Sequence, residues 1–153
     1  DIDKIEEAAD ISGLKIAVGS GTNQEQVLLA WNKELEDAGE EPAELQYYDD
    51  NAATVLALQS GRIDVTFGPN ATSAWAARET GDTKLVGIVS GGWPATADIA
   101  AGTAKGNGLI EPVAIALNAL IEGGQYDEVL EIWGLESEGV DESLVNPPGL
   151  PKS

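Results

Sequence analysis

The segment best suited to chemistry is a glycine-rich turn, Gly19-Ser20-Gly21-Thr22-Asn23, which follows an apolar stretch and opens a helical pattern. Backbone N–H groups at a helix start have no partner within the helix, and they attract a carboxylate or a phosphate. Ser20 and Thr22 add hydroxyl donors, and the glycines let the backbone approach a ligand closely. Taken alone, the motif is explained slightly better by an ordinary strand-to-helix turn with Thr22 as the N-cap.

The same turn does not match the common nucleotide-binding loops. No Gly-Lys-Ser or Gly-Lys-Thr follows it, so it is not a Walker A loop. The dinucleotide fingerprint needs a third glycine at the position where Gln24 stands. Nucleotide binding is therefore not expected.

Composition removes several classes of site. The 153 residues can form one compact domain with a sizeable core, but they include no Cys and no His. A thiolate nucleophile, a Cys-based metal site and a Ser-His-Asp triad are therefore impossible within this chain. Eight Lys and Arg residues against 27 Asp and Glu residues give a net charge of −19. Such a field repels nucleic acids and anionic lipid surfaces, so no nucleic-acid partner is expected.

Other polar groups have plainer interpretations. Asp64 is expected to tie a loop while Arg62 is solvated or paired. Acidic pairs such as Asp49-Asp50 are interpreted as helix caps and solvated faces, because nothing in one sequence brings two carboxylates together as an acid–base pair.

Three of the four tryptophans have predicted roles of two kinds. Trp31 and Trp75 lie on helical apolar stripes and are predicted to be core residues. Trp93 stands in a Gly-rich loop, and it is the aromatic residue predicted to face a ligand or a partner.

Strand and helix patterns alternate along the chain, which predicts an α/β fold with a doubly wound, mostly parallel sheet. In such sheets ligands bind beyond the carboxyl ends of the strands. The turns at 19–23, 68–70 and 90–94 are therefore predicted to form a binding rim. Strands are expected at 14–18, 43–48, 63–67, 84–89 and 96–101, and helices at 27–38, 52–60, 70–79, 109–121 and 126–133. The apolar faces of two of these helices are predicted to be Val55, Leu56 and Leu58, and Ile110, Val113, Leu117 and Leu120.

Four segments follow one another along the chain: Gly13-Leu14-Lys15-Ile16-Ala17-Val18, Ser20-Gly21-Thr22, Leu58-Gln59-Ser60-Gly61-Arg62-Ile63-Asp64 and Gly123-Gly124-Gln125-Tyr126-Asp127-Glu128-Val129-Leu130-Glu131-Ile132-Trp133-Gly134. In their order and spacing these segments resemble the family 3 bacterial solute-binding proteins, the polar amino-acid receptors of ABC importers. The resemblance spans nearly the whole chain, and the ending Asn146-Pro147-Pro148-Gly149-Leu150-Pro151 is similar to that of actinobacterial members.

The resemblance implies a periplasmic-binding-protein type II-like lobe and an incomplete second lobe. Residues 1–92 are expected to hold ligand-binding lobe 2. Residues 93–153 are expected to hold the hinge return, helices that would pack on lobe 1, and a Pro-rich tail. The main part of lobe 1 is not in this sequence, so the chain is expected to be a fragment. The acidic start has no apolar core of a signal peptide, so any signal peptide is expected to have been removed.

The resemblance also implies a ligand site. In the family, the turn that matches Ser20 to Asn23 holds the α-carboxylate of the ligand. An Arg of lobe 1 that clamps the same carboxylate has no counterpart here, and the usual Asp after the third strand of lobe 2 is replaced by Gly68-Pro69-Asn70. Catalytic residues, metals and cofactors are not expected. The predicted ligand-binding residues are Ser20, Gly21, Thr22, Asn23, Gly68, Pro69, Asn70 and Trp93.

The implied function is that of an extracytoplasmic substrate-binding component of an ABC importer, located in the periplasm or on the cell surface as a lipoprotein. Its implied partners are a small polar ligand, an amino acid or a related carboxylate, and an ABC permease. The alternatives are a ligand-sensing module of a membrane receptor or, further off, an enzyme similar to cyclohexadienyl dehydratases. Because lobe 1 would cover helix 109–121 and Trp133, an intermolecular contact or swap through residues 97–133 is also expected.

Overall fold

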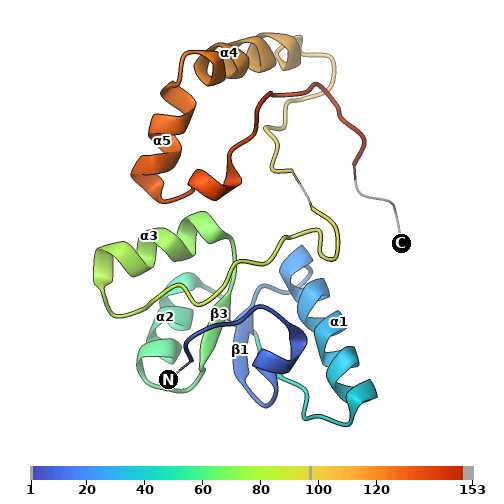
Figure 1. Cartoon of the computed structure of the whole chain (residues 1–153), viewed down its shortest axis with the longest axis vertical. Helices are drawn as coiled ribbons and strands as arrows, with labels where there is room; N and C mark the ends of the chain where they lie inside the picture. Colours follow the sequence, from blue (N-terminus) through green and yellow to red (C-terminus); the bar gives the residue numbers. More distant parts are fainter. Residues whose placement is uncertain (1, 97, 150–153) are drawn as a thin grey trace. The chain divides into compact units, whose positions relative to one another are not determined.

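The computed structural model describes residues 2–96 and 98–149. The chain divides into two compact units, Asp1–Thr96 and Ala97–Ser153 (Figure 1). The expected boundary lay at residues 92 and 93. The assignment of the first unit as a ligand-binding lobe and of the second as a returning segment stays a prediction.

A three-stranded parallel sheet organises the first unit, with the strand order β2-β1-β3. The central strand β1 pairs with both neighbours, and its last residue, Val18, lies opposite Phe67 of β3. Because helices connect the strands, all three can run in the same direction, as the α/β pattern predicts. The strands are β1 (Lys15–Val18), β2 (Glu44–Gln46) and β3 (Val65–Phe67).

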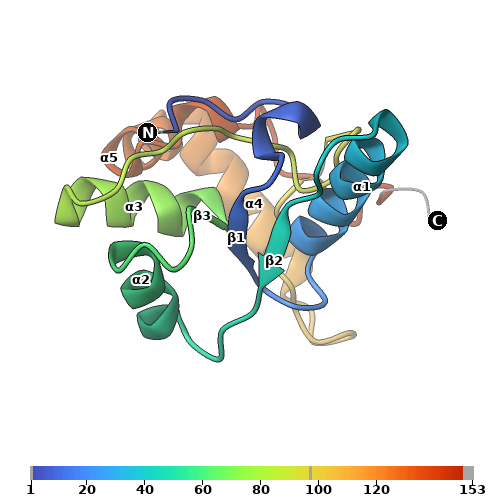
Figure 2. The ribbon, with the colours of Figure 1, turned by 90° about the horizontal axis from the view of Figure 1, so that it is seen from below.

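Capping residues in the sequence mark several starts and ends of the helices of this unit. The Thr22 side chain caps α1 (Asn23–Ala38), and the Asp50 side chain caps α2 (Asn51–Gln59). Gly39 and Gly81 end α1 and α3 (Asn70–Thr80) in the left-handed conformation that favours glycine. A 3₁₀ turn, η1 (Ala8–Ile11), precedes β1. Figure 2 shows α1 on one side of the sheet and α2 and α3 on the other.

Side-chain alternation along β1 explains this layering. Ile16 and Val18 belong to a core cluster with the α1 residues Val27, Leu28, Trp31 and Leu35, whereas Ala17 packs with Ala57 and Ile63. Successive residues of a strand point to opposite faces, so one short strand supports helices on both sides. Trp31 is 1% exposed, which confirms its prediction as a core residue.

The predicted inward face of α2 is wrong at two of its three residues. Val55 and Leu56 are 36% and 58% exposed, whereas Leu58 is partly buried and packs against the cluster that contains Ala57. Ala57 is the residue that is fully buried, because α2 lies close to Ala17 and only a small side chain fits between them. Trp75 of α3 is likewise 47% exposed, so its prediction as a core residue is also wrong.

Two predicted strands do not form in the described residues. Residues 84–89 form no ladder, and one backbone hydrogen bond, from the Ile5 N–H to the Val86 carbonyl at 2.8 Å, ties them to the N-terminal segment, together with an ion pair between Lys84 and Asp3. A single bond does not make a strand, which needs a repeated ladder. The weakly signalled strand at 96–101 is absent from residues 96 and 98–101.

The second unit contains two helices and a 3₁₀ turn: α4 (Ile110–Glu122), α5 (Gln125–Trp133) and η2 (Glu136–Glu138). Both helices were expected. Of the predicted face of α4, Ile110, Val113 and Leu117 are partly buried, whereas Leu120 is 45% exposed and Ala114 is the buried residue. Asn118 connects α4 to the following segment, because its side chain exchanges two hydrogen bonds with the Ser143 backbone.

The expected tail is described only as far as residue 149, so Leu150 and Pro151 of the matched ending lie outside the described residues. Within the described part of the chain, no helix is long and apolar enough to span a bilayer.

Candidate functional site

The predicted anion-binding turn is a solvent-exposed bend directly after the central strand. Ser20, Gly21 and Asn23 are exposed, and Thr22 is partly buried. Gly21 has a φ of +73°, a conformation that disfavours residues with a Cβ atom, so glycine is required there. The bend thus lies at the carboxyl edge of the sheet, where the α/β fold places ligands.

Thr22 fixes the start of α1 with both functions of its hydroxyl group. The Oγ1 atom accepts a hydrogen bond from the Glu25 N–H at 3.2 Å and donates one to the Gly19 carbonyl at 2.7 Å. This geometry confirms the predicted N-cap role. Because the hydroxyl proton is already committed to Gly19, the bend offers a ligand mainly backbone N–H groups and the Ser20 hydroxyl.

A carboxylate of the protein itself occupies part of the bend. Glu25 Oε2 accepts a hydrogen bond from the Gly21 N–H at 2.6 Å, and Oε1 accepts one from the Tyr47 hydroxyl at 2.7 Å. The Tyr47 hydroxyl, and after it the Gly21 amide, holds the pKa of Glu25 below its ordinary value of 4.5. The same hydrogen bond raises the pKa of Tyr47 above 10.0.

The sequence analysis did not identify Glu25 and Tyr47. A signal for Glu25 exists, because Thr22 followed three residues later by Glu25 is a capping-box pattern. Gly21, rather than the N-cap residue, donates to the carboxylate here. Tyr47 has no comparable signal: its contact depends on the pairing that sets the end of β2 beside β1.

The second predicted turn lies next to the bend. Since Val18 and Phe67 are register partners, Gly19 and Gly68 leave the sheet from adjacent strands at the same edge. Pro69 precedes α3 and Asn70 begins it, with the Asn70 side-chain oxygen buried. The structure therefore brings together the ends of the two strands that the turns 19–23 and 68–70 follow. The turn at 68–70 contains no acidic residue.

Trp93, from the third turn of the predicted binding rim, packs against α1 and not against the bend. Its ring lies edge-to-face on Trp31, with ring centroids 5.9 Å apart and an interplanar angle of 89°. Trp31 is eight residues beyond the start of α1, roughly 12 Å along the helix axis at 1.5 Å per residue. Trp93 is thus attached to the core below the bend, and its contact with a ligand stays a prediction.

The plainer interpretations of the remaining polar residues are confirmed. Asp64 ties the start of β1 to the segment before β3, because its Oδ2 accepts a hydrogen bond from the Lys15 N–H at 2.8 Å. Arg62 is exposed and donates to the Ser60 hydroxyl at 3.3 Å. Asp50 caps α2 by accepting from the Ala53 N–H at 2.8 Å.

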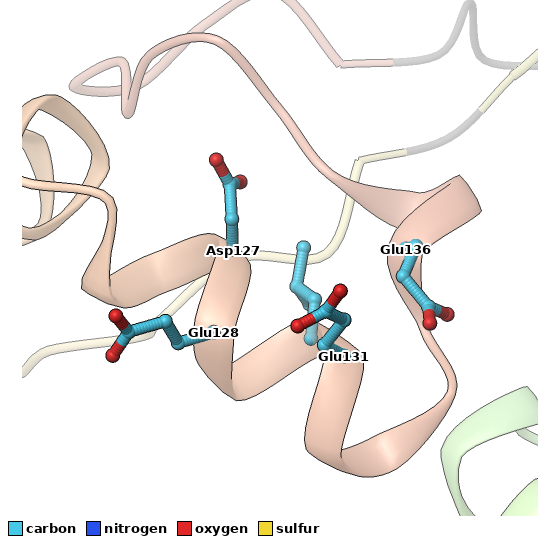
Figure 3. Close-up of a pocket in the computed structure, with 5 residues that line it drawn as sticks. Asp127, Glu128, Glu131 and Glu136 are labelled. Atoms are coloured by element: carbon cyan, nitrogen blue, oxygen red, sulfur yellow. The ribbon is translucent and has the colours of Figure 1, made fainter.

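Two shallow hollows of about 290 Å³ lie among the described residues, one in each unit, and none of the predicted ligand-binding residues lines either of these two. The hollow of the second unit is acidic, with Asp127, Glu128, Glu131 and Glu136 around Leu130. Figure 3 shows that the labelled carboxylates point in different directions and do not converge. No group of potential ligands suited to a metal ion occurs among the described residues.

Comparisons with known proteins find similarity to arginine-binding proteins. No protein-family model matches it. The arginine-binding protein ArgT of Corynebacterium glutamicum is 31% identical over 126 residues, and the match covers 76% of this chain and 38% of that protein. The chain thus spans well under half the length of this curated relative.

Solved structures agree on the fold. An ancestral arginine-binding protein bound to arginine matches with a TM-score of 0.54 and 26% identity, over 86% of this chain and 55% of that one. An ancestral arginine-binding protein bound to glutamine matches with a TM-score of 0.59 and 24% identity, over 88% and 56%. The likeness to a mutant of ArgBP from T. maritima, at 19% identity and a TM-score of 0.55, likewise shows the fold. The expected α/β binding-protein fold and the expected family resemblance are both confirmed.

Proposed function

From the premise that this chain is related to the family 3 solute-binding proteins, we propose that it supplies the lobe-2 part of a receptor that binds a polar amino acid. The observation that supports this most directly is the exposed bend at residues 19–23, at the carboxyl end of the central strand. Its N–H groups would receive the α-carboxylate of the ligand. The predicted ligand-binding residues Gly68, Pro69 and Asn70 would flank that position.

Arginine is the first ligand to test. The curated relative and both ancestral solved proteins are arginine-binding proteins by name, and one of these two structures holds arginine and the other glutamine. The net charge of −19 also favours a cationic solute, because a strongly negative surface attracts and concentrates a guanidinium group.

Calorimetric titration of the chain with L-arginine, L-glutamine and succinate tests this proposal. Because the lobe 1 Arg expected in the family has no counterpart here, we expect a weak but saturable heat with at least one of the amino acids. Ser20→Ala should weaken that binding by about three- to tenfold, the effect of one lost hydrogen bond. Ser137→Ala, an exposed serine of the second unit, is the matched control and should leave the affinity unchanged. Absence of heat with every amino acid would contradict the proposal.

The transport context is proposed on the same basis. We infer an extracytoplasmic location and an ABC permease as the membrane partner, with hinge closure around the ligand as the signal that the permease reads. The relatives named above are binding proteins and not enzymes, so no turnover is expected. Recovery of the unchanged ligand after long incubation with the protein is the check.

We also propose that residues 97–133 contact a second copy of the chain. Large apolar side chains of this segment are exposed, among them Ile115, Ile132 and Trp133 at 69%, 63% and 46%. Because each copy carries a charge of −19, association should strengthen as salt screens the repulsion. Sedimentation velocity over a range of protein and salt concentrations tests this, and a monomer at the highest concentration and salt would contradict it.

A further inference from the structure

The most unusual feature of the bend is that a carboxylate of the protein already accepts a hydrogen bond from one of its backbone N–H groups. The Gly21 N–H is 2.6 Å from Glu25 Oε2, and the Tyr47 hydroxyl holds the other oxygen of the same carboxylate at 2.7 Å. Glu25 is fixed from two elements, the bend before α1 and the segment after β2, so its position does not depend on α1 alone.

An N–H group directs one strong hydrogen bond at a time, so Glu25 and an incoming anion compete for the Gly21 amide. The charge of Glu25 acts on the neighbouring amides as well. An external anion bound at the N–H groups of Thr22 or Asn23 would lie close to the Glu25 carboxylate. Two neighbouring negative charges repel each other appreciably near a protein surface. The lowered pKa of Glu25 keeps that charge in place at neutral pH.

We propose that Glu25 is a built-in occupant of the bend that makes it reject free inorganic anions. Within the proposed function, on which this inference rests, a ligand carboxylate must displace Glu25 from the Gly21 amide. Only a ligand with further favourable contacts can do so, and Glu25 is therefore a specificity-determining residue. Tyr47 keeps it in place and is a positioning residue.

The test uses inorganic sulfate and needs no amino-acid ligand. Amide resonances of Gly21, Thr22 and Asn23 are followed by NMR during sulfate titrations at constant ionic strength. In wild type we expect no saturable shift. In Glu25→Ala the Gly21 amide should shift saturably, with half-saturation at least about tenfold below the highest sulfate concentration at which wild type shows no saturable shift. Glu34→Gln, which removes one charge from an exposed position of the same helix, should behave as wild type.

Glu25→Gln is a control for the possibility that removing the Glu25 side chain only disturbs the start of α1. Glutamine keeps an acceptor for the Gly21 N–H and removes the charge, so α1 stays capped and sulfate should shift the bend amides to an intermediate degree. Equal responses of wild type and both Glu25 variants, including no response in any of them, would overturn the proposal. Titration of wild type with L-arginine is scored separately, so failure of the proposed function and failure of the Glu25 role are told apart.

Discussion

The two units of this chain use similar helices but differ in how they bury them. In the first unit a parallel sheet lies between helices, and Ile11, Ile16, Leu28, Trp31 and Ile63 are all at or below 2% exposure. In the second unit Ala114, at 8%, is the buried residue among those described, and the apolar faces of α4 and α5 remain largely open. Amphipathic helices therefore do not guarantee a core: a helix needs a second surface against which to bury its apolar face.

The largest expected difference is in the loss of stability when a tryptophan of each unit is replaced by alanine. Trp31→Ala should destabilise the first unit by about 3–5 kcal/mol, because it leaves a large cavity between α1 and β1. Trp133→Ala in the second unit should change stability by less than about 1 kcal/mol, since Trp133 is 46% exposed. Urea unfolding followed by far-ultraviolet circular dichroism measures both. Equal losses would show that the second unit has a core that its exposed side chains do not suggest.

Hydrogen exchange sharpens the comparison without mutation. Amides in the middle of α4 and α5 should exchange about a hundredfold faster than those of β1 and the middle of α1, because helices with few buried apolar contacts open locally. The measurement is native-state exchange at low denaturant. Matching protection in the two units would mean that they unfold together.

Two alanines offer a matched pair of substitutions. Ala57 is fully buried against Ala17 and Ile63, so Ala57→Val should destabilise the first unit by about 1–3 kcal/mol through overpacking. Ala116 of α4 is exposed, and Ala116→Val should cost only the helix propensity, about 0.5 kcal/mol. The difference in denaturation midpoint between the two variants checks this, and a tolerated Ala57→Val would place α2 farther from the sheet.

Helix capping also differs between the units, because α1 and α2 of the first unit have side-chain caps, whereas α3 of that unit and both α4 and α5 of the second have none. Thr22→Ala should lower the stability of the first unit by about 1 kcal/mol through loss of the α1 cap. Thr72→Ala, at an exposed position within α3, is the control and should be neutral or slightly stabilising. A neutral Thr22→Ala would show that Glu25 alone holds the start of α1.

The smallest expected effect is a pH dependence that belongs to the first unit. Because the pKa of Glu25 is lowered in the folded protein, its contribution to stability is fully present above the ordinary value of 4.5 and is lost as pH falls through the lower, folded value. Wild type should therefore be more stable than Glu25→Gln at about pH 7, and the difference should shrink as the pH falls below 4.5. Urea titrations across this range test it, and a difference that stays constant with pH would show that the Glu25 charge has no role in folding.

Much of this molecule follows from local sequence signals. The three sheet strands, the α1 cap at Thr22, the α2 cap at Asp50 and both helices of the second unit were predicted, because apolar periodicity and capping residues act over a few neighbours. The glycine-rich bend and its place after the strand at 14–18 were predicted for the same reason.

The tertiary structure decided which faces are buried and what occupies the bend. Whether Leu56 or Ala57 faces the sheet depends on how closely α2 approaches β1, and whether Trp75 is buried depends on a covering surface that periodicity cannot supply. The contact of Tyr47 with Glu25 arises from strand pairing between segments 22 residues apart, so no local pattern predicts that Tyr47 holds the Glu25 carboxylate, although the spacing of Thr22 and Glu25 is a local signal for Glu25 itself. Local physics sets the elements, but burial and site geometry depend on long-range packing, because both require surfaces that come from distant parts of the chain.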